Sequence, residues 1–391
     1  MMHPLRRVLF ISPLFSPFHI EVGEALRALG GVDYRIAFGM RLRQGRNQPH
    51  WTSYRYDTTH YSTMSDDGDP RAFYVDAIRA FKPDVLITGQ VIGPLLQSVL
   101  DTYRDGGYGL AAWMEPPDHT RPAYYRLATA TAMRARLMLV DAVLAIGDRA
   151  ERYYRACAPH AMISLVPYGE DLSRCLAATE ADKRSEFTFL YSGQLRPHHN
   201  LGVIMASTAA VARTYGTAQM RLVLAAAGRD QVIVDRWLER DPRLAEVVSY
   251  DRDYATWADR LRPFIYSHAL VYPCSYTGWG LVVPEAMAAG CIPISSRYVE
   301  ASRFLVRHRV NGIFIEPTER ELTREMGWCL EHRDQVRQMG CAAKEAARDG
   351  DAPAIARRLR EAILAIGAPA ARSRRHRVAT ELLRKAHDLW A

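Results

Sequence analysis

The sequence lacks the spacings that mark metal-binding and disulfide-rich proteins. Its six cysteines form no CxxC pair, and its histidines form no HxxxH pair. A disulfide framework is typical of short secreted domains, whereas this chain has 391 residues. Because the histidines, aspartates and glutamates are scattered, we expect no metal ion and no other resident cofactor. The cysteines are expected to be free thiols, mostly buried, in a reducing cytosol.

Long apolar runs are also missing. No segment reaches the roughly 18 consecutive apolar residues that a membrane-spanning helix needs. Two arginines precede an apolar run near the N-terminus, as in a signal peptide. Pro13 interrupts that run, however, and no small-residue cleavage site follows it. The sequence therefore predicts a cytoplasmic protein.

The chain carries excess positive charge without the motifs of a nucleic-acid-binding protein. Its net charge is +8, but lysines and arginines are spread along most of its length. Neither a zinc-finger spacing nor an aromatic RNP motif is present. An anionic small ligand, an anionic membrane surface or an Arg-rich proteome can each explain the charge. We therefore expect no nucleic-acid partner.

Short β-branched and aromatic runs alternate with helical patterns along the chain. The first run is Arg6–Ser12 and a later one is Val85–Thr88, and both are followed by loops and stretches of helical spacing. This alternation predicts an α/β fold of doubly wound parallel sheets. A polar stretch without an apolar face, Leu176–Phe187, separates two such series. We therefore predict Rossmann-like domains over residues 1–175 and 176–365, and a basic helical tail over residues 366–391.

Two facing sheets would place ligands in a central cleft, because ligands lie beyond the carboxyl ends of parallel strands. A Rossmann dehydrogenase is disfavoured, because no GxGxxG follows an early strand. The loops expected to face the cleft are Ser12–His19, Gly89–Pro94, Glu115–Pro122, Ser192–Asn200 and Ser275–Pro284.

The stretch Tyr276–Gly290 places a single acid, Glu285, in what looks like the first turn of a helix. Pro284 suits the first helical position, and Gly278 and Gly280 would let backbone N–H groups approach a ligand. A helix N-terminus attracts phosphate, and a carboxylate there can accept hydrogen bonds from sugar hydroxyls. Glu285 could therefore bind a nucleotide, or it could only stabilise the start of the helix. The residues alone leave both interpretations open.

The segment GLVVPEAMAAGCIPISS, followed by VNGIFIEP at Val310–Pro317, resembles the retaining glycosyltransferases of family 4, which have the GT-B fold. FLYSGQLRPHHN resembles the phosphate loop of that family, and VPYGED resembles its interdomain turn. The resemblance covers the C-terminal half, whereas in the N-terminal half it is architectural. It implies two Rossmann-like domains facing a central cleft, with the last helices returning to the N-terminal domain.

The resemblance implies which residues bind a nucleotide-diphosphate sugar. Glu285 matches the family glutamate that binds the ribose, whereas Thr277 stands where the family has a second glutamate that binds the donor sugar. In the phosphate loop, His199 occupies the usual lysine position, and we expect it to assist as a cation beside Arg196 and backbone amides. The implied donor-binding residues are Glu285, Thr277, Trp279, Gly280, Leu281, Gly193, Gln194, Arg196 and His199.

The N-terminal loop WMEPPDHTRP is implied to lie near the anomeric carbon and the acceptor. We expect Glu115 and His119 to be catalytic, and His19, Glu21 and Asp118 to contact the acceptor. A structural alternative is that the loop is only a surface turn stiffened by its prolines.

The expected function is retaining transfer of a sugar from a nucleotide-diphosphate sugar to a hydroxyl of a polysaccharide, a lipid-linked molecule or a natural product. Two other functions stay open, a nucleotide-sugar epimerase and a non-catalytic nucleotide-sugar-binding protein. The basic amphipathic tail Arg372–Trp390 could also rest on the inner membrane surface.

Overall fold

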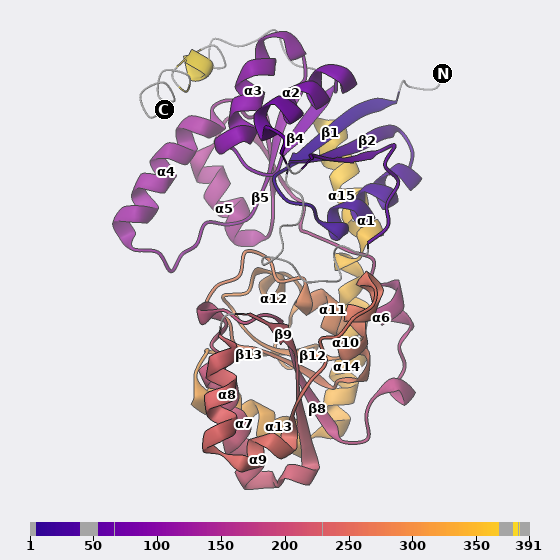
Figure 1. The fold of residues 1–391 in the computed structure, drawn as a ribbon, viewed down its shortest axis with the longest axis vertical. Coiled ribbons are helices and arrows are strands. Elements are labelled where there is room, and N and C mark those ends of the chain that lie inside the picture. Colours follow the sequence, from indigo (N-terminus) through magenta and orange to yellow (C-terminus); the bar gives the residue numbers. More distant parts are fainter. Residues whose placement is uncertain are drawn as a thin grey trace. The chain divides into compact units, whose positions relative to one another are not determined.

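The computed structural model describes residues 5–39, 54–65, 67–228, 230–366, 378–381 and 383. The chain divides into two compact units, Met1–Gly169 with Ala352–Ala391, and Glu170–Asp351. Figure 1 shows each unit as a sheet flanked by helices. The division falls at Gly169, a few residues before the boundary at residue 175 that the sequence predicts.

The first unit contains a seven-stranded parallel sheet with the order β3-β2-β1-β4-β5-β6-β7. Its strands are β1 (Arg6–Ser12), β2 (Val32–Phe38), β3 (Tyr61–Thr63), β4 (Val85–Thr88), β5 (Gly109–Met114), β6 (Ala142–Ala145) and β7 (Met162–Leu165). Its helices are α1 (Pro17–Ala28), α2 (Pro70–Phe81), α3 (Gly93–Gly106), α4 (Ala123–Leu137), α5 (Asp148–Cys157) and α15 (Ala352–Ala365).

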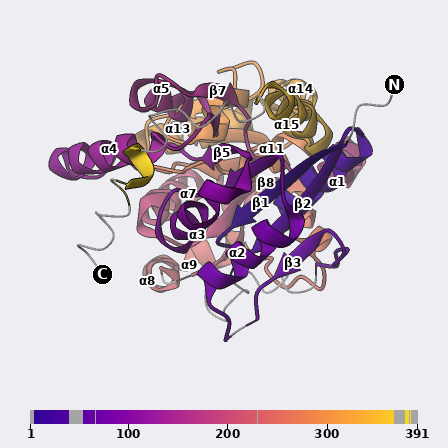
Figure 2. The ribbon, with the colours of Figure 1, turned by 90° about the horizontal axis from the view of Figure 1, so that it is seen from above.

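Burial on both faces of this sheet explains why its strands are almost continuously apolar. Along β1, Leu9 and Ile11 join the core cluster beneath α2, α3 and α5, while Phe10 packs against His19 of α1. On that second face α1 lies beside α15 (Figure 2). The Nε of Arg360 in α15 donates to the carbonyl of Gly30, 3.2 Å away.

The placement of α15 corrects the sequence prediction, which assigned residues up to 365 to the second domain. The helix buries Ile355, Leu359 and Ile363 and packs against α1 of the first unit. The sequence shows that this helix has an apolar face. Which of the two sheets that face covers depends on the path of the chain. Most of the basic tail, Arg372–Trp390, lies outside the described residues. Among the described residues, no helix is long and apolar enough to span a bilayer.

The second unit contains a six-stranded parallel sheet with the order β10-β9-β8-β11-β12-β13. Its strands are β8 (Phe187–Gln194), β9 (Met220–Ala227), β10 (Val248–Tyr250), β11 (Ala269–Tyr272), β12 (Ile292–Ser296) and β13 (Ile313–Ile315). Its helices are α6 (Ser173–Ala177), α7 (Leu201–Tyr215), α8 (Gln231–Arg240), α9 (Pro242–Val247), α10 (Arg262–Tyr266), α11 (Val282–Ala288), α12 (Glu300–Leu305), α13 (Glu319–Glu331) and α14 (Arg333–Ala347).

Each sheet has one point where the strand order reverses. In the first unit this switch point lies between β1 and β4, and in the second unit between β8 and β11. Ligands of open α/β sheets bind beyond the carboxyl ends of the strands at such a point. In the second unit, the loops leaving β8 and β11 are the two that carry the motifs found in the sequence.

Candidate active site

The two motif-bearing loops of the second unit are joined by hydrogen bonds. The backbone N–H of Ser275 donates to the carbonyl of His198, 2.8 Å away. The Asn200 amide donates to the Pro273 carbonyl at 2.7 Å and to the Ser275 hydroxyl at 2.8 Å. The structure therefore brings together the predicted phosphate loop and the Thr277 segment, which are more than 70 residues apart in the sequence.

Two glycines allow these loops their backbone conformation. Gly193 has φ 126° and Gly280 has φ 98°, values that side-chain-bearing residues rarely adopt. A Cβ atom on Gly280 would also lie 3.0 Å from a methyl group of Val299 and 3.3 Å from the methyl group of Thr277. Close packing and positive φ thus both require glycine at position 280.

The structure corrects the expectation that His199 is a cation. Its ring is buried, and Nδ1 lies 2.6 Å from the hydroxyl of Tyr191. Burial and the neighbouring His198 lower the pKa of His199 to about 4. A neutral His199 cannot neutralise a diphosphate at pH 7, so its role is to hold the loop against β8. Arg196 is exposed and provides the permanent positive charge of this loop.

Glu285 lies deeper than the sequence suggests. The helix begins at Val282 rather than at Pro284, and Glu285 lies in its first turn, as the sequence predicts. The carboxylate is 6% exposed, and its Oε1 lies 3.0 Å from Nη2 of Arg260. The side chain is therefore part of a buried ion pair in the first turn of the helix.

A second buried carboxylate, that of Glu170, shares the same arginine. Nη2 of Arg260 contacts Oε2 of Glu170, and the guanidinium lies 3.5 Å from the ring centroid of Trp257. Burial raises the pKa of Glu285, while Arg260 and a hydrogen bond with Glu170 oppose this shift. A hydrogen bond between two carboxyl groups requires one proton. The cluster of Glu170, Arg260 and Glu285 is therefore close to neutral when that proton is bound.

Sequence reasoning missed Arg260 and Glu170. Glu170 lies in the VPYGED turn, which the sequence analysis identified only as an interdomain turn. Arg260 lies in a short helical segment, Trp257–Leu261, where nothing distinguishes it from the other arginines. Burial was the distinguishing signal, and it appears only in the folded unit.

The remaining predicted donor residues lie at the end of β8 and in the loop between β11 and α11. The Thr277 hydroxyl donates to the backbone carbonyl of Tyr276 at 2.8 Å. Trp279 is 2% exposed and packs against Phe304, with 5.8 Å between ring centroids. Within the described part of the chain, its indole N–H has no hydrogen-bond partner. Leu281 and Gln194 are half-buried, and the Gln194 carbonyl accepts from Tyr191.

In the first unit, Glu115, Asp118 and His119 follow β5 directly, but the structure gives them different surroundings. Asp118 accepts from the N–H of Thr120 at 2.9 Å and pairs with Arg121 at 3.2 Å, so it shapes the turn. His119 Nδ1 lies 3.2 Å from Nη1 of Arg149.

The Glu115 carboxylate is exposed, although the protein packed around it raises its pKa to about 7 by desolvation. An exposed carboxylate keeps part of its hydration, which limits this rise. A glutamate whose pKa is raised is a stronger base than an ordinary one.

His19 lies in an aromatic cluster of the first unit. Its ring is 6% exposed and has centroids of Phe10, Phe18, Trp113 and Tyr168 within 5.3 Å. Neither ring nitrogen has a hydrogen-bond partner among the described residues, and burial lowers the pKa to about 3. Glu21 is half-buried, two residues further along α1. His19 is therefore neutral and packed.

The described ranges contain no group of three or more His, Cys, Asp or Glu side chains arranged to hold a metal ion.

Comparison with known proteins connects this geometry with an activity. Residues 178–346 match the family of glycosyl transferases group 1. The second unit is a glycosyl transferases group 1 domain. The match spans both joined loops, the Arg260–Glu285 pair and the whole of the second sheet. None of the curated proteins compared matches the chain in sequence.

Solved structures place both units in the GT-B fold. Sucrose-phosphate synthase from Thermosynechococcus elongatus superposes with a TM-score of 0.70 at 17% identity, over 91% of this chain and 98% of that one. HepE from Anabaena, in complex with UDP and glucose, gives a TM-score of 0.70 at 13% identity, over 92% and 99%. A glycosyltransferase from Rickettsia africae gives 0.69 at 12% identity, over 93% and 99%.

These comparisons confirm the fold class and the glycosyltransferase activity that the sequence predicts. They do not favour an epimerase or a non-catalytic binding protein, because the matching family consists of transferases. The chain is a glycosyltransferase.

Proposed function

We propose that this glycosyltransferase moves a sugar from a nucleotide-diphosphate sugar to a hydroxyl acceptor with retention of the anomeric configuration. The observation that carries the proposal is the pair of joined loops at the switch point of the second sheet, within the family match. The second unit would hold the donor and the first unit would present the acceptor.

The donor diphosphate would bind at the loop leaving β8. Arg196 supplies a permanent charge, and backbone N–H groups near the positive-φ Gly193 supply hydrogen bonds. HepE is complexed with UDP and glucose, so a uridine diphosphate sugar is the first donor to test. The proposal requires no metal, because Arg196 and backbone dipoles can stabilise the leaving diphosphate.

Glu285 would accept hydrogen bonds from the ribose hydroxyls, with Arg260 keeping its carboxylate ionised. Arg260 would then be a positioning residue that acts through Glu285. If the proton on the Glu170–Glu285 pair leaves when the donor binds, donor binding changes the charge of the cluster. If that proton is confined to Glu170, the charge of the cluster stays the same.

Transfer would take place on one face of the donor sugar. The acceptor oxygen forms a bond to the anomeric carbon on the side from which the phosphate oxygen departs. The bond to that phosphate oxygen breaks, and the acceptor proton passes to the departing diphosphate. Glu115, with its raised pKa, would orient the acceptor hydroxyl and support the positive charge that develops at the anomeric carbon.

Thermal-shift screening against a panel of nucleotide sugars tests the donor assignment. A ligand at 100 times its dissociation constant should add about 2.7 kcal/mol to the free energy of unfolding. NMR of the product then tests retention, because the anomeric coupling constants of donor and product should match. A donor sugar that is epimerised without an acceptor would contradict transfer and support the epimerase alternative. Turnover that stops in excess chelator and returns with a divalent ion would contradict metal independence.

Cellular placement belongs to the same proposal. Five of the six cysteines are buried, and Cys341 is exposed. None of the six forms a disulfide bond. This pattern fits a reducing compartment, so we propose that the protein works in the cytoplasm. Contact of the basic tail with the inner membrane surface is part of this proposal, although the tail lies mostly outside the described residues.

A further inference from the structure

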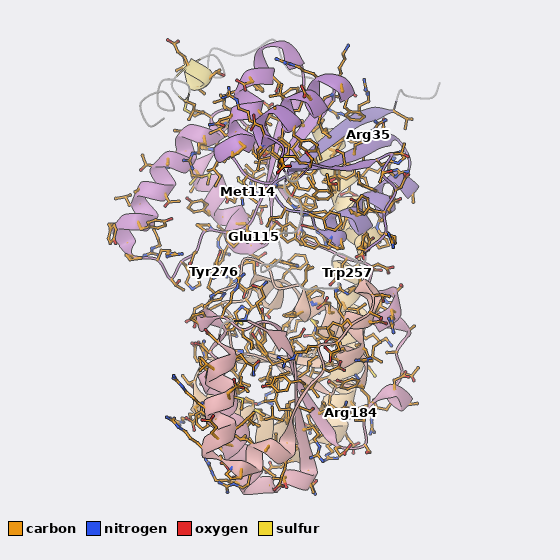
Figure 3. The ribbon with its side chains drawn as sticks, in the orientation of Figure 1. Arg35, Met114, Glu115, Arg184, Trp257 and Tyr276 are labelled. Carbon is orange, nitrogen blue, oxygen red and sulfur yellow. The ribbon has the colours of Figure 1, made fainter. Side chains whose placement is uncertain are left out.

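A pocket of about 310 Å³ opens in the second unit at the end of the sheet opposite to the joined loops. Its lining includes Phe187 at the start of β8, His268 just before β11, and Gly290 just before β12. The joined loops leave the other ends of these strands, and the eight residues of β8 span roughly 23 Å. Figure 3 shows Arg184, on the pocket side, well away from Tyr276 of the second loop.

The lining of this pocket is strongly basic. Five of its residues are lysines or arginines and one, Glu180, is an acid. The basic residues are Lys183, Arg184, Arg333, Arg337 and Lys344. They come from the segment before β8 and from α14, so two parts of the chain more than 140 residues apart supply the charge.

Most of these cations are held by uncharged groups. Nζ of Lys183 donates to the carbonyls of Ser267 at 2.6 Å and Ala289 at 2.8 Å, and Nζ of Lys344 donates to the Ala178 carbonyl. Carbonyl oxygens orient an ammonium group without cancelling its charge. The positions of these lysines are therefore defined, and burial lowers the pKa of Lys183.

The two arginines nearest the sheet are held in a similar way. Arg184 lies over the ring of Tyr266 at 4.0 Å, and Nη2 of Arg333 donates to the side-chain oxygen of Gln219 at 3.2 Å. The one ion pair to a lining acid joins Arg337 to Glu180 at 3.1 Å. After that pair is discounted, the lining keeps an excess of four positive charges at neutral pH.

The ring of His268 forms part of the wall of the pocket. Burial, followed by Lys183, Arg333 and Arg337, lowers the pKa of His268 to about 4. Burial is the largest cause, and the smaller contribution of the three cations has the sign that favours an anion.

We propose that this pocket binds an anion with at least two phosphate charges. Four cations of the lining pair with no acid of the lining, and their number matches the charge of a pyrophosphate or a bisphosphorylated molecule. Two acids, Asp182 and Glu186, lie near these cations but outside the lining. Arginine forks suit phosphate oxygens. Free phosphate esters and the headgroups of anionic lipids share this chemistry. The inference stands on the pocket alone and does not depend on the donor site, which lies at the other end of the sheet.

Cys341 allows a local test, because it lines the pocket and is the one exposed cysteine of the six. A thiol reagent should modify Cys341 in the native protein while the five buried thiols stay unmodified. Inorganic pyrophosphate should slow this modification at an ionic strength matched with sodium chloride. An equal rate with and without pyrophosphate would overturn the proposal.

Charge variants make the test specific. The double variant Arg184→Gln/Arg333→Gln should weaken pyrophosphate protection at least about tenfold, because two charge-assisted contacts are lost. Glu180→Gln should strengthen protection, because it removes the acid of the lining. Arg348→Gln is the matched control, since Arg348 is exposed on the chain just after α14 and pairs with Glu345 outside the lining. If it weakens protection as much as the double variant, general charge is responsible and the pocket is not a site.

Two further arms separate the sources of the anion and separate this site from the donor site. The first arm tests whether the protein sediments with phosphatidylcholine vesicles that contain phosphatidic acid. If the wild type sediments with them and the double variant does not, the ligand is a lipid headgroup. If pyrophosphate protects Cys341 but the protein does not sediment with the vesicles, the ligand is a free phosphate. Arg196→Ala should leave the protection of Cys341 unchanged. Loss of protection in that variant would show that pyrophosphate acts from the donor site, and would overturn the proposal.

Discussion

Nη2 of Arg260 lies 3.0 Å from Oε1 of Glu285, and both side chains are less than a tenth exposed. The same guanidinium nitrogen contacts Glu170, so one cation serves two buried carboxylates. An ion pair of this kind is costly to break, because the remaining charges stay in a medium of low polarity.

Arg260→Met should therefore destabilise the second unit by about 3–5 kcal/mol, because it leaves Glu170 and Glu285 without a cation. Urea denaturation at pH 7 measures the loss. Arg174→Met is the control, since Arg174 forms an exposed pair with Asp259 and should change stability by less than about 1 kcal/mol. Adding Glu170→Gln to the Arg260 variant should restore part of the stability. A loss equal to that of the control would show that the cluster is not coupled.

Glu285→Gln should weaken binding of a nucleotide donor about tenfold or more, because an amide accepts the ribose hydroxyls without the charge. Calorimetry with the free nucleotide measures this. Glu170→Gln changes the other carboxylate of the cluster and should weaken binding less. Equal effects of the two substitutions would mean that the cluster acts as a whole and that Glu285 does not itself contact the ribose.

His199 is neutral in the structure, so its titration should not change the affinity for the donor between pH 6 and pH 8. Its pKa of about 4 lies well below that range. Arg196→Ala should weaken donor binding at every pH in the range, since arginine does not titrate there. Affinity that falls steeply as pH rises, and that becomes flat in His199→Phe, would restore the cationic role expected from the sequence.

Thr277→Glu should change which sugars the donor site prefers. Threonine is short and uncharged, and here its hydroxyl donates to the Tyr276 carbonyl. It therefore does not require a hydrogen bond from the hydroxyls of the donor sugar. A glutamate would favour sugars that offer hydroxyls to it and disfavour those that leave it unpaired. We expect the wild type to accept deoxy or modified sugars, and the variant to shift toward ordinary glucose. Competition between the two nucleotide sugars measures the ranking, and an unchanged ranking would remove Thr277 from the specificity residues.

His19 should make the first unit sensitive to acid. Burial lowers its pKa to about 3, whereas an unfolded histidine titrates near 6.5, so the unfolded state binds the proton more tightly. The stability that His19 contributes is therefore complete above pH 6.5 and is lost as pH falls from 6.5 toward 3. The slope should be on the order of 1 kcal/mol per pH unit in that window. His19→Leu should flatten the dependence measured by urea denaturation between pH 7 and pH 5, and an equal slope in both proteins would contradict the assignment.

The alternation of apolar runs and helical patterns was enough to predict two doubly wound sheets. Strand β1 begins and ends at Arg6 and Ser12, as the sequence predicts, because a strand buried on both faces must be almost continuously apolar. The motif-bearing loops were also predictable, since strand ends and glycines are local features. The family match over residues 178–346 rests on the same local patterns.

The charge state of the site depended on contacts that only the tertiary structure forms. Glu170, Arg260 and Glu285 lie far apart in the chain, and nothing in the sequence near Arg260 shows that it is buried. The sequence predicted that His199 is a cation of the phosphate loop, but its burial beside Tyr191 leaves it neutral. The apolar face of helix α15 could pack against either domain. The path of the chain places it against α1 of the first unit.

The sequence by itself thus determined the elements, the fold class and the loops that carry the chemistry, because hydrophobic periodicity and turn residues act over a few neighbouring positions. The tertiary structure alone decided which carboxylates share a cation, which histidines are neutral and where basic residues gather around a pocket. Those properties depend on desolvation and on distances between segments that are remote in sequence, and neither quantity can be calculated before the chain has folded.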